Sequence, residues 1–183
     1  MSGGHGHVEH HGGNKRVALL ISILALVLAF AETLGKSAQT NALAMNIEAS
    51  NLWAFFQAKT IRQTVLRTAA EQTEILNSTQ TSTKQVEAWR KTAQRYQSEP
   101  ETGEGRDQLA ARAKAAEKKR DTSMAAYHHY ELASAVVQIA IVLASASIIA
   151  EIVALVWIAA GLGALGVAFC LIGFFWPTAV HLF

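Results

Sequence analysis

The chain has 183 residues, of which 51% are hydrophobic, and its formal net charge is only +2. So small a charge gives no support for nucleic-acid binding, and the sequence carries no nucleic-acid-binding motif. The single cysteine, Cys170, excludes an intramolecular disulfide and a cysteine-based zinc cluster. The hydrophobic residues gather at the two ends of the chain, which indicates membrane-spanning segments rather than one ordinary soluble domain.

Residues 1–16 form a histidine-rich tail, which we expect to be disordered. This tail holds the candidate metal ligands His5, His7, His10 and His11. Nothing in their spacing fixes a coordination geometry, and we therefore expect no metal site and no cofactor.

The segment 17–34 is predicted to be the first transmembrane helix. Its uncharged run Val17–Ala31 follows Lys15 and Arg16, as the apolar core of a membrane anchor follows a basic flank. A cleavable signal peptide has the same order of regions, but no A-x-A-like cleavage site follows cleanly. We favour an anchor that is retained.

The apolar segment Leu132–Trp176 contains one charged residue, Glu151. As a single straight helix it would be about 67 Å long, roughly twice the hydrocarbon thickness of a bilayer. We predict transmembrane helices at 132–150 and 152–176 with Glu151 at the turn, and a short tail at 177–183. A break at Gly161–Gly163 is the alternative.

A row of small residues in the last span could pack against another transmembrane helix: Ala160, Gly163, Ala164 and Ala168.

The middle of the chain, residues 36–131, is rich in charges of both signs and reads as helix. Turn-forming residues at Asn77–Thr83 and Ser98–Gly105 divide it into helices at about Ser37–Leu76, at about Lys84–Gln97, and from Arg106 into the second span. The first helix rises about 60 Å and the other two return about 61 Å. These lengths predict a long antiparallel, coiled-coil-like hairpin, with a shorter three-helix bundle as the alternative.

The first hairpin helix has two apolar faces. One face holds Leu43, Ile47, Ala54, Ala58, Ile61, Val65, Ala69 and Leu76, and we assign it to the hairpin seam. The opposite face holds Met45, Ala49, Leu52 and Phe56 and ends there, because Gln63, Arg67 and Glu74 continue it as polar. We predict that a further neighbour contacts Met45, Leu52, Trp53 and Phe56. This neighbour is the lipid interface, a second copy of the chain or a different protein, and we favour a protein contact over lipid. Leu109, Ala113, Ala116 and Tyr127 share a face on the return arm. Ordinary packing without a function of its own is the alternative for all these faces.

Polar groups near the spans are Glu32, Gln138 and Glu151. Such groups can mark an ion path, although both glutamates fall at predicted span ends.

His128 and His129 should point in different directions on a helix, so they cannot share one ligand. The sequence contains no recognisable nucleophile, paired catalytic carboxylates or phosphate-binding loop, and we expect no enzymatic activity.

Two blocks, Asn14–Thr40 and Asn46–Glu71, resemble the bacterial membrane proteins grouped as domain-of-unknown-function family 4337. The likeness extends over most of the chain. It implies a bacterial, integral membrane protein and brings no catalytic residues.

The basic residues give two opposed indications of orientation. Lys15 and Arg16 favour a cytoplasmic N-terminus, whereas the basic run Lys118–Arg120 favours a cytoplasmic hairpin. Because loops longer than about 60 residues largely escape the positive-inside rule, we expect the N-terminus in the cytoplasm.

The sequence as a whole predicts an all-α integral membrane protein with three transmembrane helices, located in the bacterial inner membrane. We expect a structural or interaction protein whose hairpin mediates homo-oligomerisation or attachment to a membrane complex. Its expected partners are the lipid bilayer and a second copy or another membrane protein, with no nucleic acid. The alternatives are an oligomeric small-solute or ion pathway and, less favoured, metal handling by the histidine tail.

Overall fold

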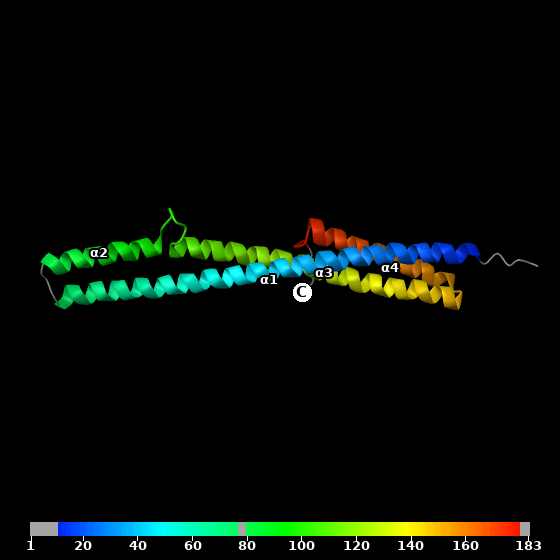
Figure 1. Cartoon of the computed structure of the whole chain (residues 1–183), viewed down its shortest axis with the longest axis horizontal. Coiled ribbons are helices and arrows are strands. Elements are labelled where there is room, and N and C mark those ends of the chain that lie inside the picture. The colour runs from blue at the N-terminus through cyan, green and yellow to red at the C-terminus, as the bar shows by residue number, and fades with distance from the viewer. Residues whose placement is uncertain (1–10, 77–79, 180–183) are drawn as a thin grey trace, which may run out of the picture. The chain divides into compact units, whose positions relative to one another are not determined.

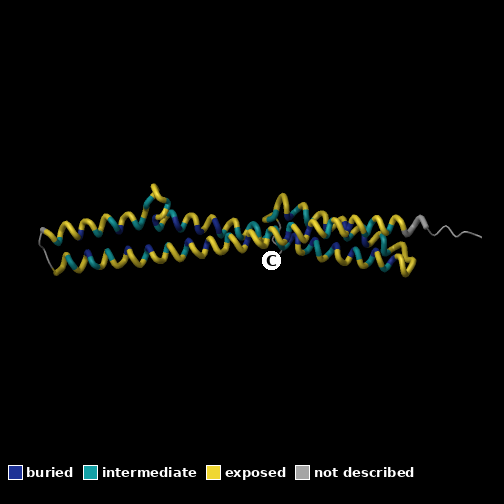
Figure 2. Tube along the Cα trace, in the orientation of Figure 1, coloured by how far each residue is buried: buried dark blue, intermediate teal, exposed yellow. Residues whose placement is uncertain are grey.

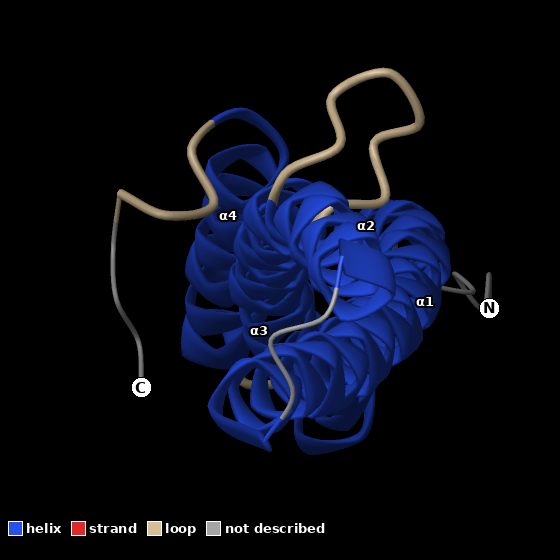
Figure 3. Cartoon of the chain, turned by 90° about the vertical axis from the view of Figure 1, so that its left-hand side faces the viewer, coloured by secondary structure: helices blue, strands red, loops and turns tan. Residues whose placement is uncertain are grey.

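The computed structural model describes residues 11–76 and 80–179, and their side chains from Lys15 and from Thr81 onward in the two stretches. Within these ranges the chain forms four helices: α1 (His11–Leu76), α2 (Gln80–Gln97), α3 (Arg106–Ala150) and α4 (Val153–Phe175) (Figure 1). Figure 3 shows that helices and their connections account for all of the described chain. The all-α prediction is therefore confirmed.

The helix ends follow the turn-forming residues closely. α1 ends at Leu76 and α3 begins at Arg106, where the sequence predicts these boundaries. α2 begins at Gln80 rather than at Lys84, so the predicted break Asn77–Thr83 was too long. Threonine and serine are poor helix formers, but they do not stop a helix as proline does.

Two glycines shape the connection between α2 and α3. Gly103 has a φ of +69°, which lies in the left-handed region that glycine adopts without steric cost. A Cβ on Gly105 would collide with the backbone nitrogen of Glu99 and with the side chain of Gln108. Glycine is therefore required at position 105 by close packing and favoured at position 103 by backbone conformation.

Helices α1, α3 and α4 are each long and apolar enough to cross a membrane, which supports a membrane protein. α3 ends at Ala150 and α4 begins at Val153, so the chain turns at Glu151 and not at Gly161–Gly163. Glu151 has a φ of 53°, a left-handed conformation that glycine or asparagine usually supplies. The turn therefore exists without the glycine or proline that would mark it in a sequence.

The chain divides into two compact units, and α1 and α3 contribute to both. Unit 1 comprises the residues up to Thr40 and those from Thr122 onward, and unit 2 comprises Asn41–Asp121.

In unit 1, three helices pack around a small apolar core. The core contains Leu24 of α1, Ala159 of α4, and Val137, Ala140 and Ala144 of α3. Many large apolar side chains face outward instead: Leu19, Ile23, Leu26, Phe30, Ile139, Val142, Trp157, Leu171 and Phe174 are among them. An outer surface of this composition is suited to lipid and unsuited to water.

Glycines, more than alanines, bring α4 close to its neighbours. A Cβ on Gly163 would strike the side chain of Leu24, and one on Gly166 would strike Val137. The buried residues of α4 are Ala159, Gly163, Gly166 and Gly173. In the predicted packing row, Gly163 is in place, Ala160 is half-buried, and Ala164 and Ala168 are exposed. Side chains four residues apart drift around the helix, so Ala164 and Ala168 leave the contact within the chain. Packing of a further transmembrane helix on them stays a prediction.

In unit 2, α1 lies antiparallel to α2 and to the first part of α3. Residue numbers in the contacting pairs run in opposite directions: Asn46 contacts Arg120, Trp53 contacts Glu117, and Glu74 contacts Arg90. Antiparallel pairing is what the matched helix lengths predict, and short connections allow it.

The inner face of α1 in unit 2 is a row of buried and half-buried residues spaced by threes and fours, as in a heptad repeat (Figure 2). We call these residues the inner row: Ala42, Met45, Ala49, Leu52, Phe56, Lys59, Gln63, Leu66 and Ala70. They include the face that we predicted for an external partner. The residues that we predicted for the hairpin seam face outward instead. The exposed fractions of Leu43, Ile47 and Ile61 are 60%, 53% and 65%. The two faces were exchanged in the prediction.

Truncation of Leu109, which is fully buried against the inner row, should destabilise unit 2. We expect Leu109→Ala to cost about 2–5 kcal/mol, because it removes buried methyl groups and leaves a cavity. Hydrogen exchange of the amides of residues 41–121 in the full-length protein in mild detergent measures this loss. Leu76→Ala is the matched control, because Leu76 is 82% exposed. Equal effects of the two substitutions would contradict the assignment of the faces.

Candidate functional site

The segment Asn51–Lys59 forms the apolar centre of unit 2. Leu52 is buried against Leu109 and Ala113 of α3, and Trp53 and Phe56 pack on the same cluster. The Trp53 indole nitrogen donates a hydrogen bond to a Glu117 carboxylate oxygen at 2.9 Å, which satisfies its polar atom. These aromatic side chains therefore hold α1 to α3 within one chain.

The residues predicted to contact an external partner pack inside unit 2 instead. Met45 is half-buried, and Leu52, Trp53 and Phe56 are occupied by contacts inside unit 2. The prediction on the return arm agrees with the structure, since Leu109, Ala113 and Ala116 are buried. The sequence thus identified the α3 side of the seam, whereas it assigned the α1 side to the wrong face.

Lys59 lies in the inner row although it is charged. It is only 5% exposed, and its Nζ lies 3.7 Å from a carboxylate oxygen of Glu99 and 3.7 Å from one of Glu104. The same Nζ lies 5.2 Å from the centre of the Phe55 ring. A buried ammonium needs such partners, because an unpaired charge in the interior is strongly unfavourable.

Gln63 is the second polar member of the inner row. Its Nε2 donates to the backbone oxygen of Ala93 at 2.8 Å, and its Oε1 accepts from the Arg106 guanidinium. The guanidinium also lies over the Phe56 ring at 4.8 Å. Gln63 therefore connects α1 to α2 and to the start of α3 with its hydrogen-bonding capacity used.

The opposite face of α1 in unit 2 has no covering element within the described chain. Val65 is 60% exposed, like Leu43, Ile47 and Ile61 on the same face. Contiguous exposed apolar side chains outside a membrane mark an interaction surface. This outer face is the candidate functional site of unit 2.

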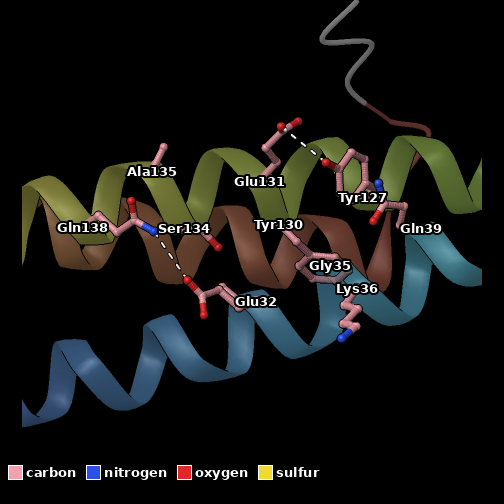
Figure 4. A pocket seen from close by; sticks show the side chains of 11 residues that line it. Glu32, Gly35, Lys36, Gln39, Tyr127, Tyr130, Glu131, Ser134, Ala135 and Gln138 are labelled. Carbon is pink, nitrogen blue, oxygen red and sulfur yellow. Dashed lines mark hydrogen bonds between the residues drawn. The ribbon is translucent and has the colours of Figure 1, made fainter.

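Unit 1 contains an open groove of about 500 Å³ between α1 and α3. Glu32, Lys36, Gln39, Glu131, Ser134 and Gln138 give it its polar lining. Figure 4 shows Gln138 directed toward Glu32, and the Gln138 Nε2 donates to Glu32 Oε1 at 3.4 Å. Two of the predicted polar residues are thus brought together, whereas Glu151 lies at the exposed turn between α3 and α4.

The two adjacent histidines of α3 differ in environment, as predicted. The His128 Nδ1 lies 3.6 Å from a Glu131 carboxylate oxygen. His129 is 1% exposed, stacks on Phe169 at a centroid distance of 6.5 Å, and has no hydrogen-bond partner for its ring nitrogens in the described structure. Each histidine faces different neighbours, so they do not form one site.

The described residues contain no group of three or more His, Cys, Asp or Glu side chains placed to hold a metal ion. The candidate ligands His5, His7 and His10 lie outside the described residues, as does the side chain of His11. The expectation that the tail holds no metal site therefore stays a prediction. The expectation of disorder was wrong for residues 11–16, which belong to α1.

Acidification should weaken the α2–α3 connection through Glu99. Its hydrogen bond from Arg95 holds the pKa of the Glu99 carboxyl below its ordinary value of 4.5, and Lys59 acts in the same direction. A lowered pKa in the folded state stabilises the fold above pH 4.5, and this stabilisation is lost as the pH falls through the folded-state value.

Hydrogen exchange of residues 93–109 between pH 7 and pH 3, corrected for intrinsic rates, tests this linkage. We expect Glu99→Gln to exchange faster at pH 7 and to change less on acidification than the unmodified chain. The control Glu71→Gln, at an exposed position, should retain the full acid response. An unchanged acid response in Glu99→Gln would contradict the linkage.

Comparison with known proteins gives a family but no characterised relative. No curated protein and no solved structure matches the chain. The model of one family, the domain of unknown function DUF4337, matches residues 13–176. This match covers nearly all of α1 and every later helix, and it confirms the resemblance seen at Asn14–Thr40 and Asn46–Glu71. The chain therefore belongs to the DUF4337 family.

Proposed function

We propose that this protein is a non-enzymatic structural or interaction protein of the bacterial inner membrane. Its three apolar helices cross the bilayer, with the N-terminus in the cytoplasm as Lys15 and Arg16 favour. Its coiled-coil-like unit 2 mediates assembly, with a second copy of the chain or with a membrane complex.

The observation that carries this proposal is the exposed outer face of α1 in unit 2. An antiparallel hairpin needs one apolar face on each helix, and the inner row with Leu109 and Ala113 already supplies it. The exposed Ile47, Ile61 and Val65 have no role in that packing. Aliphatic side chains of this size, held on one face outside the apolar spans, are stabilised when a partner covers them.

The assembly state of the full-length protein tests the proposal. We expect native mass spectrometry of protein purified gently from its own membranes to show an assembly, either of identical chains or with another protein. Ile61→Asp should abolish the assembly, because it would bury a carboxylate in the contact. Thr64→Asp is the control, since Thr64 is exposed on a neighbouring face. A monomer in the unmodified sample, or equal effects of both substitutions, would contradict the proposal.

The groove in unit 1 supports a second candidate function, an oligomeric pathway for a small solute or ion. The contact between Gln138 and Glu32 places an amide and a carboxylate together beside predicted membrane spans, where polar groups often line a path.

Flux through reconstituted vesicles tests this second function. Gln138→Leu should abolish solute or ion flux, because it removes the amide that contacts Glu32. Gln85→Leu, at an exposed glutamine of α2 that lies outside this face of α1, serves as the control and should leave the flux unchanged. Vesicles that remain tight to ions and small solutes with the unmodified protein would count against a pathway.

A further inference from the structure

The outer face of α1 in unit 2 has a more specific order than a general apolar surface. Ten exposed residues recur along it with alternating spacings of three and four. We call them the outer row: Ala44, Ile47, Asn51, Ala54, Ala58, Ile61, Val65, Thr68, Gln72 and Ile75. This spacing is the heptad repeat of a helix that contacts another helix, and it is also the spacing of the buried inner row.

Charge is excluded from the outer row. The exposed charged residues of this part of α1 are Glu48, Arg62, Arg67, Glu71 and Glu74, and every one of them lies off the row. Solvent alone would not require such a separation, because charged side chains are the usual occupants of an exposed helix face. The outer row therefore has the uncharged composition of a helix–helix interface.

The polar members of the outer row favour a protein occupant over lipid. Asn51 and Gln72 each carry an amide with donors and an acceptor. In hydrocarbon these groups would have no partner, whereas the same amide on a second helix supplies both a donor and an acceptor. An asparagine at a core position of a parallel helix pair is also a known determinant of register.

The orientation of the contact follows from the membrane. If the apolar helices span the bilayer, as proposed above, all copies of the chain point in the same direction. Neighbouring copies are then related by rotation about an axis normal to the membrane, and their α1 helices run parallel. Each residue of the row would face its own counterpart, so a charged residue in the row would face a like charge. The outer row has none.

We propose that α1 pairs through the outer row with α1 of a second copy of this chain, parallel and in register. This proposal rests on the proposed function and deepens it by naming the partner and the contact. Asn51 faces Asn51 of the second copy, and the isoleucines and Val65 above and below it exclude water from the pair.

Disulfide cross-linking in native membranes tests the register. In a Cys170→Ala background, single cysteines replace Ala44, Ala58 or Gln72, which occupy equivalent heptad positions along the row. A parallel pair in register brings each cysteine close to its counterpart, and we expect all three variants to form disulfide-linked dimers on mild oxidation. The control Gln57→Cys lies beside the row and should form at least ten-fold less dimer.

Replacing the Asn51 amide by a carboxylate tests the Asn51–Asn51 contact in the same assay. Asn51→Asp, added to the Ala58→Cys variant, would bring two carboxylates together and should reduce dimer formation at least ten-fold. Asn46→Asp is the matched control, because Asn46 is exposed on α1 but lies off the row. It should leave the cross-link unchanged.

The outcomes separate this proposal from the proposed function. Cross-linking at only one of the three positions would indicate an antiparallel contact and would overturn the parallel pair. Cross-linking at none of them, while Ile61→Asp still releases a different co-purified protein, would overturn the second copy as partner and leave the interaction function intact. If no assembly of any kind is found, both are overturned.

Discussion

The packing of Leu52 and Phe56 of α1 on Leu109 and Ala113 of α3 is the contact on which unit 2 depends. It joins segments far apart in the chain and fixes which face of α1 is turned inward. Once that face is set, the helical period turns Ile47, Ile61 and Val65 outward. The candidate interaction surface is therefore a geometric consequence of the internal packing.

The polar residues of the inner row show how the contact extends beyond its apolar centre. Lys59 lies between Glu99 and Glu104, and Gln63 bonds to α2 and to Arg106. A lysine and a glutamine at core positions are less tolerant of a shifted register than leucines would be, because each needs its own partners. They favour one alignment of α1 with the α2–α3 connection.

Much of the fold could be predicted from the sequence. Helix lengths, the glycines of the α2–α3 connection and the lone Glu151 placed the principal boundaries within a few residues. The faces of α1 could not be assigned in the same way, because Ile61 and Val65 are more hydrophobic than Lys59 and Gln63. Their burial depends on partners in α2 and α3, which a helical wheel of one segment does not contain. For the same reason the groove contact between Glu32 and Gln138 was missed, although both residues had been singled out.

A double-mutant cycle between Leu52 and Leu109 tests the central contact most directly. Leu52→Ala, Leu109→Ala and the double variant would be compared in the full-length protein by hydrogen exchange of residues 41–121, at two protein concentrations. Packing within one chain predicts a coupling energy of about 0.5–3 kcal/mol that does not change on dilution. Additive effects, or a coupling that disappears on dilution, would show that these residues do not meet inside one chain and would contradict the account.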